Sequence, residues 1–104
     1  MVIVRDNPTR HRYEITDGDV VIGFLDYVRT SDRITLTHAE TDRAHRGAGV
    51  ARQLVTAALD DLRARGLAVL PQCTYVRMVI ADEANRFLDL VPVDERARFG
   101  LPVT

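Results

Sequence analysis

The sequence has no lysine, no tryptophan and a single cysteine, Cys73. One cysteine excludes a disulfide within the chain and a zinc site built from cysteines, so Cys73 is either a small packed side chain or a reactive thiol. All fourteen basic residues are arginine, which is typical of an arginine-favouring, bacterial genome. The composition therefore predicts no metal site.

Long apolar runs and strong charge are also missing. No run approaches the length of a membrane span, and the apolar part of residues 1–6 is too short for a signal peptide, so we expect a cytoplasmic protein. The net charge is −1 and the arginines are scattered, which gives no electrostatic reason to expect nucleic acid or an acidic membrane as a partner. The length of 104 residues predicts a single domain, residues 1–104, with its core at about 10–92.

Turn signals divide the chain into strands followed by helices. An alternating segment at 12–16, the hairpin signal Asp17-Gly18 and a β-branched run at 20–29 predict antiparallel strands, with Gly23 at a bulge or a close approach. Before them we expect an extended arm or a short edge strand. Further along, the pattern predicts a strand at 34–41, a helix from Gly49 to Gly66, a strand at 67–70, a helix capped by Thr74, and short helical turns around Pro92. Strand, helix and strand in this order form a right-handed parallel crossover.

The predicted strand at 34–41 changes character along its length. A period of two places Ile34, Leu36, His38 and Glu40 on one face, which therefore turns from apolar to ionisable. We expect His38 and Glu40 to lie beside any ligand held by the turn that follows. The alternative is a solvated strand end.

That turn contains two glycines, Gly47 and Gly49, directly before an amphipathic helix. Glycines let the backbone turn tightly, so that amide N–H groups point outward at the positive end of the helix dipole, where they bind anions such as phosphate. A Walker P-loop is excluded because it requires lysine, and the dinucleotide fingerprint fails because Arg52 stands where its third glycine should be. The alternative is a plain tight turn that begins a helix.

The segment Arg46-Gly47-Ala48-Gly49-Val50-Ala51 resembles the Gln/Arg-x-x-Gly-x-Gly/Ala signature of the GNAT superfamily of N-acetyltransferases. Two further segments, Thr37-His38-Ala39-Glu40 and Pro71-Gln72-Cys73-Thr74-Tyr75-Val76, resemble its small stand-alone branch. The resemblance implies an α/β (α+β) fold with a mixed sheet: an N-terminal antiparallel meander, a strand–helix–strand crossover and a C-terminal helical segment. It also implies acetyl-CoA as cosubstrate and an amine of a small molecule or protein as acceptor.

The same resemblance assigns a binding role to the backbone of the loop and of the preceding strand. It implies that the backbone of Glu40 and Thr41 pairs with the pantetheine arm. The N–H groups that would hold the diphosphate are those of Arg46, Gly47, Ala48, Gly49, Val50 and Ala51. The Arg46 side chain suits bidentate pairing with a phosphate, or it is only a surface charge.

Four side chains are candidates for the transfer itself, which needs a neutral amine, a polarised carbonyl and a proton for the departing thiolate. The resemblance implies a cleft between two splayed strands with Cys73 at its mouth, which makes Cys73 a candidate acyl-accepting nucleophile, general acid or packed cleft wall. His38 or Glu40 could take the proton from the amine, and Tyr75 could protonate the thiolate unless it is a core aromatic. The absence of lysine also fits a protein that keeps no amines of its own for an acyl donor to modify.

Two other functions stay open, namely a non-catalytic coenzyme A binding or sensing module and a structural domain whose glycine turn binds nothing. Small relatives usually carry a His-Pro-Glu-Tyr-like stretch after the second helix, whereas this chain has Asp82-Glu83-Ala84-Asn85-Arg86-Phe87. No acceptor is therefore predicted. We expect a monomer or a weak homodimer that pairs through the N-terminal edge strand.

Overall fold

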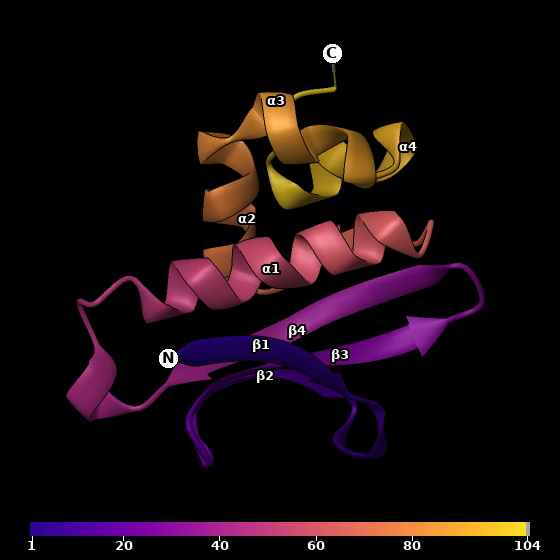
Figure 1. Cartoon of the computed structure of the whole chain (residues 1–104). Helices are drawn as coiled ribbons and strands as arrows, with labels where there is room; N and C mark the ends of the chain where they lie inside the picture. Colours follow the sequence, from indigo (N-terminus) through magenta and orange to yellow (C-terminus); the bar gives the residue numbers. More distant parts are fainter. Residues whose placement is uncertain (104) are drawn as a thin grey trace.

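The computed structural model describes residues 1–103 and consists of a five-stranded sheet with its α-helices on one side (Figure 1). The strands follow one another across the sheet as β1 (Val2–Asn7), β2 (Arg12–Asp17), β3 (Val20–Thr30), β4 (Arg33–Thr41) and β5 (Ala68–Pro71). The first four pair antiparallel, whereas β5 pairs parallel to β4. The predicted meander and parallel crossover are confirmed.

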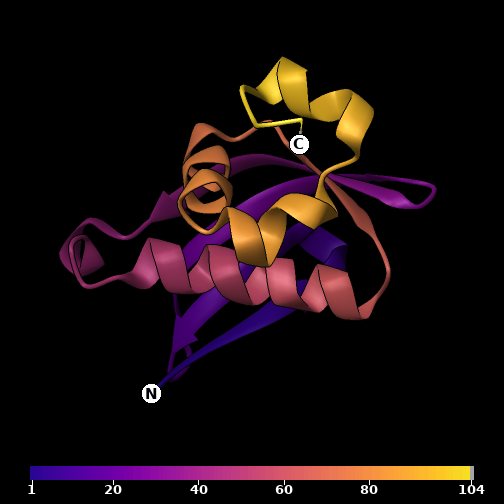
Figure 2. The same ribbon diagram turned by 90° about the horizontal axis from the view of Figure 1, so that it is seen from above.

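The helices are α1 (Val50–Ala64), α2 (Thr74–Asp82), α3 (Ala84–Phe87) and α4 (Val93–Arg96), with 3-10 turns at Pro8–Arg10, Arg43–His45, Leu88–Leu90 and Ala97–Phe99. Seen from above, α1 lies between the N-terminus and the C-terminal segment (Figure 2). Thr74 is not the N-cap of α2, as the sequence predicted, because Cys73 occupies that position in an extended conformation. None of the helices within residues 1–103 is long and apolar enough to cross a membrane.

One face of α1 forms the centre of the core. The helical period brings its apolar side chains onto that face, where Leu54, Val55, Ala58, Leu59 and Leu62 are 0% exposed. Burying each of the larger aliphatic side chains contributes about 1.5–3 kcal/mol. The core extends past residue 92, since Phe99 and Leu101 are also buried in it.

Gly23 lies at a close approach and next to a bulge, as predicted. The β2–β3 register shifts between Ile15 and Thr16, which pair with Gly23 and Val21. A Cβ atom at Gly23 would lie 3.0 Å from both the carbonyl oxygen of Glu40 and a methyl carbon of Ile15. Only glycine therefore lets β2, β3 and β4 approach this closely.

A second bulge interrupts β4. Tyr27 pairs with Leu36 and the preceding Asp26 pairs with His38, so Thr37 is an extra residue in β4. The hydroxyl of Thr37 donates a hydrogen bond to the carbonyl oxygen of Asp26 at 3.3 Å. One extra residue reverses the alternation of all side chains that follow it in the strand.

The prediction that Ile34, Leu36, His38 and Glu40 share a face is wrong because of this bulge. Ile34 and Leu36 are 2% and 0% exposed, whereas the side chains of His38 and Glu40 are 60% and 61% exposed on the opposite face of the sheet. Ala39 packs against the core in their place. The ionisable pair therefore lies on the face that carries no α-helix (Figure 1).

Candidate functional site

The two parallel strands, β4 and the edge strand β5, separate after a short pairing. β4 pairs with β5 only from Arg33 to Leu36. The carbonyl oxygen of Leu36 then accepts the Cys73 amide at 2.8 Å, and the chain turns away into α2. Residues 37–41 of β4 consequently have a neighbouring strand on one side only.

The backbone of Ala39 and Thr41 faces this open edge. The amide of Asp42 donates to the carbonyl oxygen of Ile22 at 2.7 Å, so Asp42 faces β3. Backbone groups two residues apart in a strand face the same side, so the N–H and C=O groups of Glu40 also point toward β3. Those of Ala39 and Thr41 point the other way, where no strand pairs with them. Sequence reasoning missed Ala39, since nothing in its local pattern reveals the bulge that sets this alternation.

The loop after β4 leads into α1 through two left-handed glycines. Gly47 has φ 83°, and Gly49, the N-cap of α1, has φ 75°. No side chain caps α1, and its first turn contains no acidic residue. The first amide to bond within the helix is that of Gln53, which donates to Gly49 at 3.0 Å. The preceding amides of the first turn therefore stay available to an anion.

Two of the six amides predicted to hold a diphosphate are already engaged. The amides of Arg46 and Ala48 donate to carbonyl oxygens of the preceding 3-10 turn, at 3.3 and 3.4 Å. Asp42 caps this turn by accepting from the Ala44 amide, and its other oxygen lies 3.4 Å from Nδ1 of His45, without hydrogen-bond geometry. The amides without a partner in the described chain are those of Gly47, Gly49, Val50 and Ala51.

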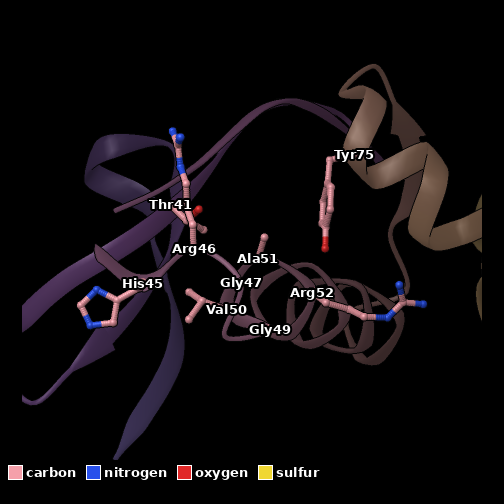
Figure 3. A pocket seen from close by; sticks show the side chains of 9 residues that line it. All are labelled: Thr41, His45, Arg46, Gly47, Gly49, Val50, Ala51, Arg52 and Tyr75. Carbon is pink, nitrogen blue, oxygen red and sulfur yellow. The ribbon is translucent and has the colours of Figure 1, made fainter. Parts of the chain in front are cut away.

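A groove lies between the unpaired end of β4, the glycine loop before α1, and α2. Two adjoining cavities, of about 270 and 480 Å³, share Thr41, Arg46, Ala51 and Tyr75 as lining residues. Figure 3 shows the Tyr75 ring standing beside the first turn of α1, with its hydroxyl directed toward that turn. The structure thus brings together the predicted residues of the loop, the strand end and α2.

The charges around the groove leave one arginine available. Arg46 forms no ion pair within residues 1–103. Arg52, in contrast, binds Glu83 at 2.8 Å and Asp82 at 3.4 Å, which raises the pKa of Arg52 and lowers that of Glu83. Its guanidinium points away from the groove in Figure 3. Arg52 therefore ties α1 to α2, and Arg46 is the cation left for a ligand.

Three of the four candidate catalytic residues line the larger cavity. His38 and Glu40 approach it from β4 and Tyr75 from α2. Nε2 of His38 lies 3.6 Å from Oε2 of Glu40. An exposed pair of this kind can take up a proton and release it to solvent.

Cys73 lies apart from these residues. The residue is 8% exposed and belongs to the hydrophobic core. It lines neither cavity of the groove. Within residues 1–103 there is also no group of three or more His, Cys, Asp or Glu side chains that could hold a metal ion.

Comparison with known proteins identifies a family. The family model described as GCN5-related N-acetyl-transferase matches residues 12–90. No curated protein matches the chain. A GCN5-like putative N-acetyltransferase from Staphylococcus aureus is similar over 86% of this chain and 87% of that protein, with 14% identity and a TM-score of 0.59.

Two larger solved structures share the fold in part. The ribosomal-protein-S18-alanine N-acetyltransferase of Escherichia coli has 24% identity and a TM-score of 0.52 over 56% of this chain and 38% of its own. Ard1 from Thermoplasma volcanium has 23% identity and a TM-score of 0.50 over 76% of this chain and 52% of its own. The chain thus spans about half or less of these two larger proteins.

Proposed function

The chain belongs to the family of GCN5-related N-acetyltransferases, and on this basis we propose that it transfers an acetyl group from acetyl-CoA to an amine of a small molecule or protein. The observation that carries the proposal is the groove in which uncapped amides of α1, the open edge of β4 and the Tyr75 hydroxyl meet. When bound there, acetyl-CoA supplies the thioester carbonyl carbon that the amine attacks.

The loop suits the diphosphate of coenzyme A. The amides of Gly47, Gly49, Val50 and Ala51 are four donors without partners, at the positive end of the α1 dipole. No acidic side chain in the first turn of α1 competes with an anion. Arg46, which has no ion pair within the described chain, adds a charge that can bind a phosphate oxygen.

The open edge of β4 suits the pantetheine arm, which has amide groups of its own. Ala39 and Thr41 present their backbone N–H and C=O groups to the groove, so the arm can pair with them as an added strand would. Glu40, which faces β3 with its backbone, takes part through its side chain instead. This refines the expectation from the sequence, which assigned the pairing to Glu40 and Thr41.

We assign the catalytic roles from the residues on the two sides of the groove, His38 and Glu40 of β4 and Tyr75 of α2. As the amine nitrogen bonds to the carbonyl carbon, it loses a proton, which Glu40 or His38 accepts directly or through water. The carbon–sulfur bond then breaks, and the thiolate takes a proton from Tyr75 Oη. Among the tyrosine hydroxyls of residues 1–103, those of Tyr13 and Tyr27 are hydrogen-bonded to side chains and that of Tyr75 is not. The burial of Cys73 supports its packing role rather than an acylated intermediate.

The test combines calorimetric titration with acetyl-CoA, thiol release in the presence of a panel of amines, and intact mass. We expect saturable binding and amine-dependent thiol release. Tyr75→Phe should lower kcat about 100-fold with little change in the Kd for acetyl-CoA, and Cys73→Ala should leave both unchanged.

Each other outcome has a definite meaning. Binding without thiol release for any amine would favour the non-catalytic coenzyme A module. A gain of one acetyl group in mass that Cys73→Ala abolishes would establish a covalent mechanism. Absence of binding would refute both coenzyme A functions.

A further inference from the structure

A separate cavity of about 400 Å³ lies beside the junction of β5 and α2 and shares no lining residue with the transfer groove. Its lining residues are Thr35, Gln72, Arg77, Arg98 and Phe99. Every polar side chain among them can donate a hydrogen bond, and no carboxylate lines the cavity. We propose that this cavity binds a carboxylate group of the acceptor, so that the substrate is an amine that also carries a carboxylate. This inference rests on the proposed transfer to an amine.

Arg77 is held in place by neutral partners. Its Nε donates to the carbonyl oxygen of Pro71 at 2.9 Å, and its Nη2 donates to that of Gln72 at 3.0 Å. These bonds use two of the five guanidinium N–H groups, and Arg77 has no acidic partner in the described chain. The side chain is therefore pre-oriented, with its charge and three donors left for a ligand.

Phe99 positions a second arginine beside the first. The ring centroid of Phe99 lies 5.3 Å from the guanidinium carbon of Arg77 and 4.6 Å from that of Arg98. Arg98 pairs with Glu95 at 3.3 Å, but the same carboxylate also binds Arg33 at 3.1 Å. Since one carboxylate serves two guanidinium groups, the surroundings of the cavity keep a net positive charge.

The outer face of β4 connects this cavity with the transfer groove. Thr35 lines the cavity, and His38 lines the groove three residues further along the same strand. Because of the bulge at Thr37, His38 lies on the face that Thr35 occupies rather than on the core face. Three residues of a strand span about 10 Å. An acceptor that reaches both sites therefore carries its amine and its carboxylate on the order of 10 Å apart, as a short peptide does.

Side-chain NMR of the ¹⁵N-labelled full chain tests the cavity directly. The probes are N-acetyl-alanyl-alanine, which carries a carboxylate and no amine, and its C-terminal amide, which lacks the charge. We expect saturable shifts of the Arg77 and Arg98 Nε–H and Gln72 amide signals with the carboxylate only. Arg98→Gln should weaken this binding about tenfold, and Arg10→Gln, a matched exposed arginine remote from the cavity, should not change it.

Three results would overturn the proposal: equal shifts with the amide, no saturable shift at millimolar carboxylate, or tighter binding of methyl phosphate than of the carboxylate. Titration of the same sample with acetyl-CoA, followed at the amides of Gly47 and Gly49, keeps the two proposals apart. Carboxylate binding without acetyl-CoA binding refutes the transfer function. Acetyl-CoA binding without carboxylate binding refutes only the acceptor class.

Discussion

Replacing Gly49 by alanine should separate ligand binding from fold stability, because the chain contains a matched control. Gly49 and Gly18 both have a positive φ, 75° and 60°, and a Cβ atom at either position would meet nothing within 4 Å. Gly18 lies in the β2–β3 turn and lines no part of the groove. The two substitutions therefore impose the same kind of backbone strain, and only one of them changes the loop.

The stability cost should be similar for both variants. A left-handed alanine costs about 1–2 kcal/mol, and the stiffer unfolded chain offsets about 0.4–1 kcal/mol of this. A net loss of about 1 kcal/mol corresponds to a fall in Tm of about 4–8 °C for a domain of this size. Relaxation of Gly49 toward negative φ would also reorient the first amides of α1, and each charge-assisted bond lost to a phosphate contributes about 1.5–3 kcal/mol.

The assay is thermal unfolding with and without acetyl-CoA. At a ligand concentration 100 times the wild-type Kd, we expect wild type and Gly18→Ala to gain about 2.7 kcal/mol. Gly49→Ala, if its affinity falls tenfold, should gain only about 1.4 kcal/mol. Equal gains for all three proteins would refute the reasoning that the Gly49 loop holds the diphosphate.

Three further predictions concern the scaffold. Tyr13 is 1% exposed, and its hydroxyl donates a hydrogen bond to Asp61 at 2.5 Å. Tyr13→Phe should therefore lower the free energy of unfolding, measured by urea denaturation, by about 1.5–3 kcal/mol. An unchanged free energy of unfolding would mean that this bond contributes nothing to stability. Burial and a hydrogen bond to an acidic neighbour raise the pKa of Tyr27 to about 12, so the folded state keeps a proton that the unfolded state releases near pH 10. Stability should therefore fall between pH 10 and 12, and Tyr27→Phe should flatten that slope. Gly23→Ala should cost about 1–3 kcal/mol and also weaken acetyl-CoA binding, because its Cβ would press on β4; unchanged binding in calorimetry would contradict this.

Local patterns were sufficient for the elements and for the loop. The 3.6-residue period of α1, the Asp17-Gly18 turn and the tight packing at Gly23 are each encoded within a few residues, and all three predictions are confirmed. The loop of residues 46–51 was identifiable for the same reason, because its glycines and its helix adjoin in sequence.

Tertiary structure decided which groups meet at the site. The bulge at Thr37 arises from the pairing of β4 with β3, and it moved His38 and Glu40 off the core face and exposed the backbone of Ala39. The burial of Cys73 likewise depends on the packing of α2 against α1 and β5. The cavity beside the junction of β5 and α2 is lined by Thr35, Arg77 and Phe99, which lie far apart in the chain.

The sequence alone therefore determined the strand and helix order, the glycine loop and the family resemblance, because short-range periodicity and turn chemistry encode them. Only the folded chain decided which face of the sheet each β4 side chain occupies after the bulge, and which groups neighbour each ionisable side chain. These depend on contacts between segments distant in sequence, where a shift of one residue moves a side chain to the opposite face of the sheet.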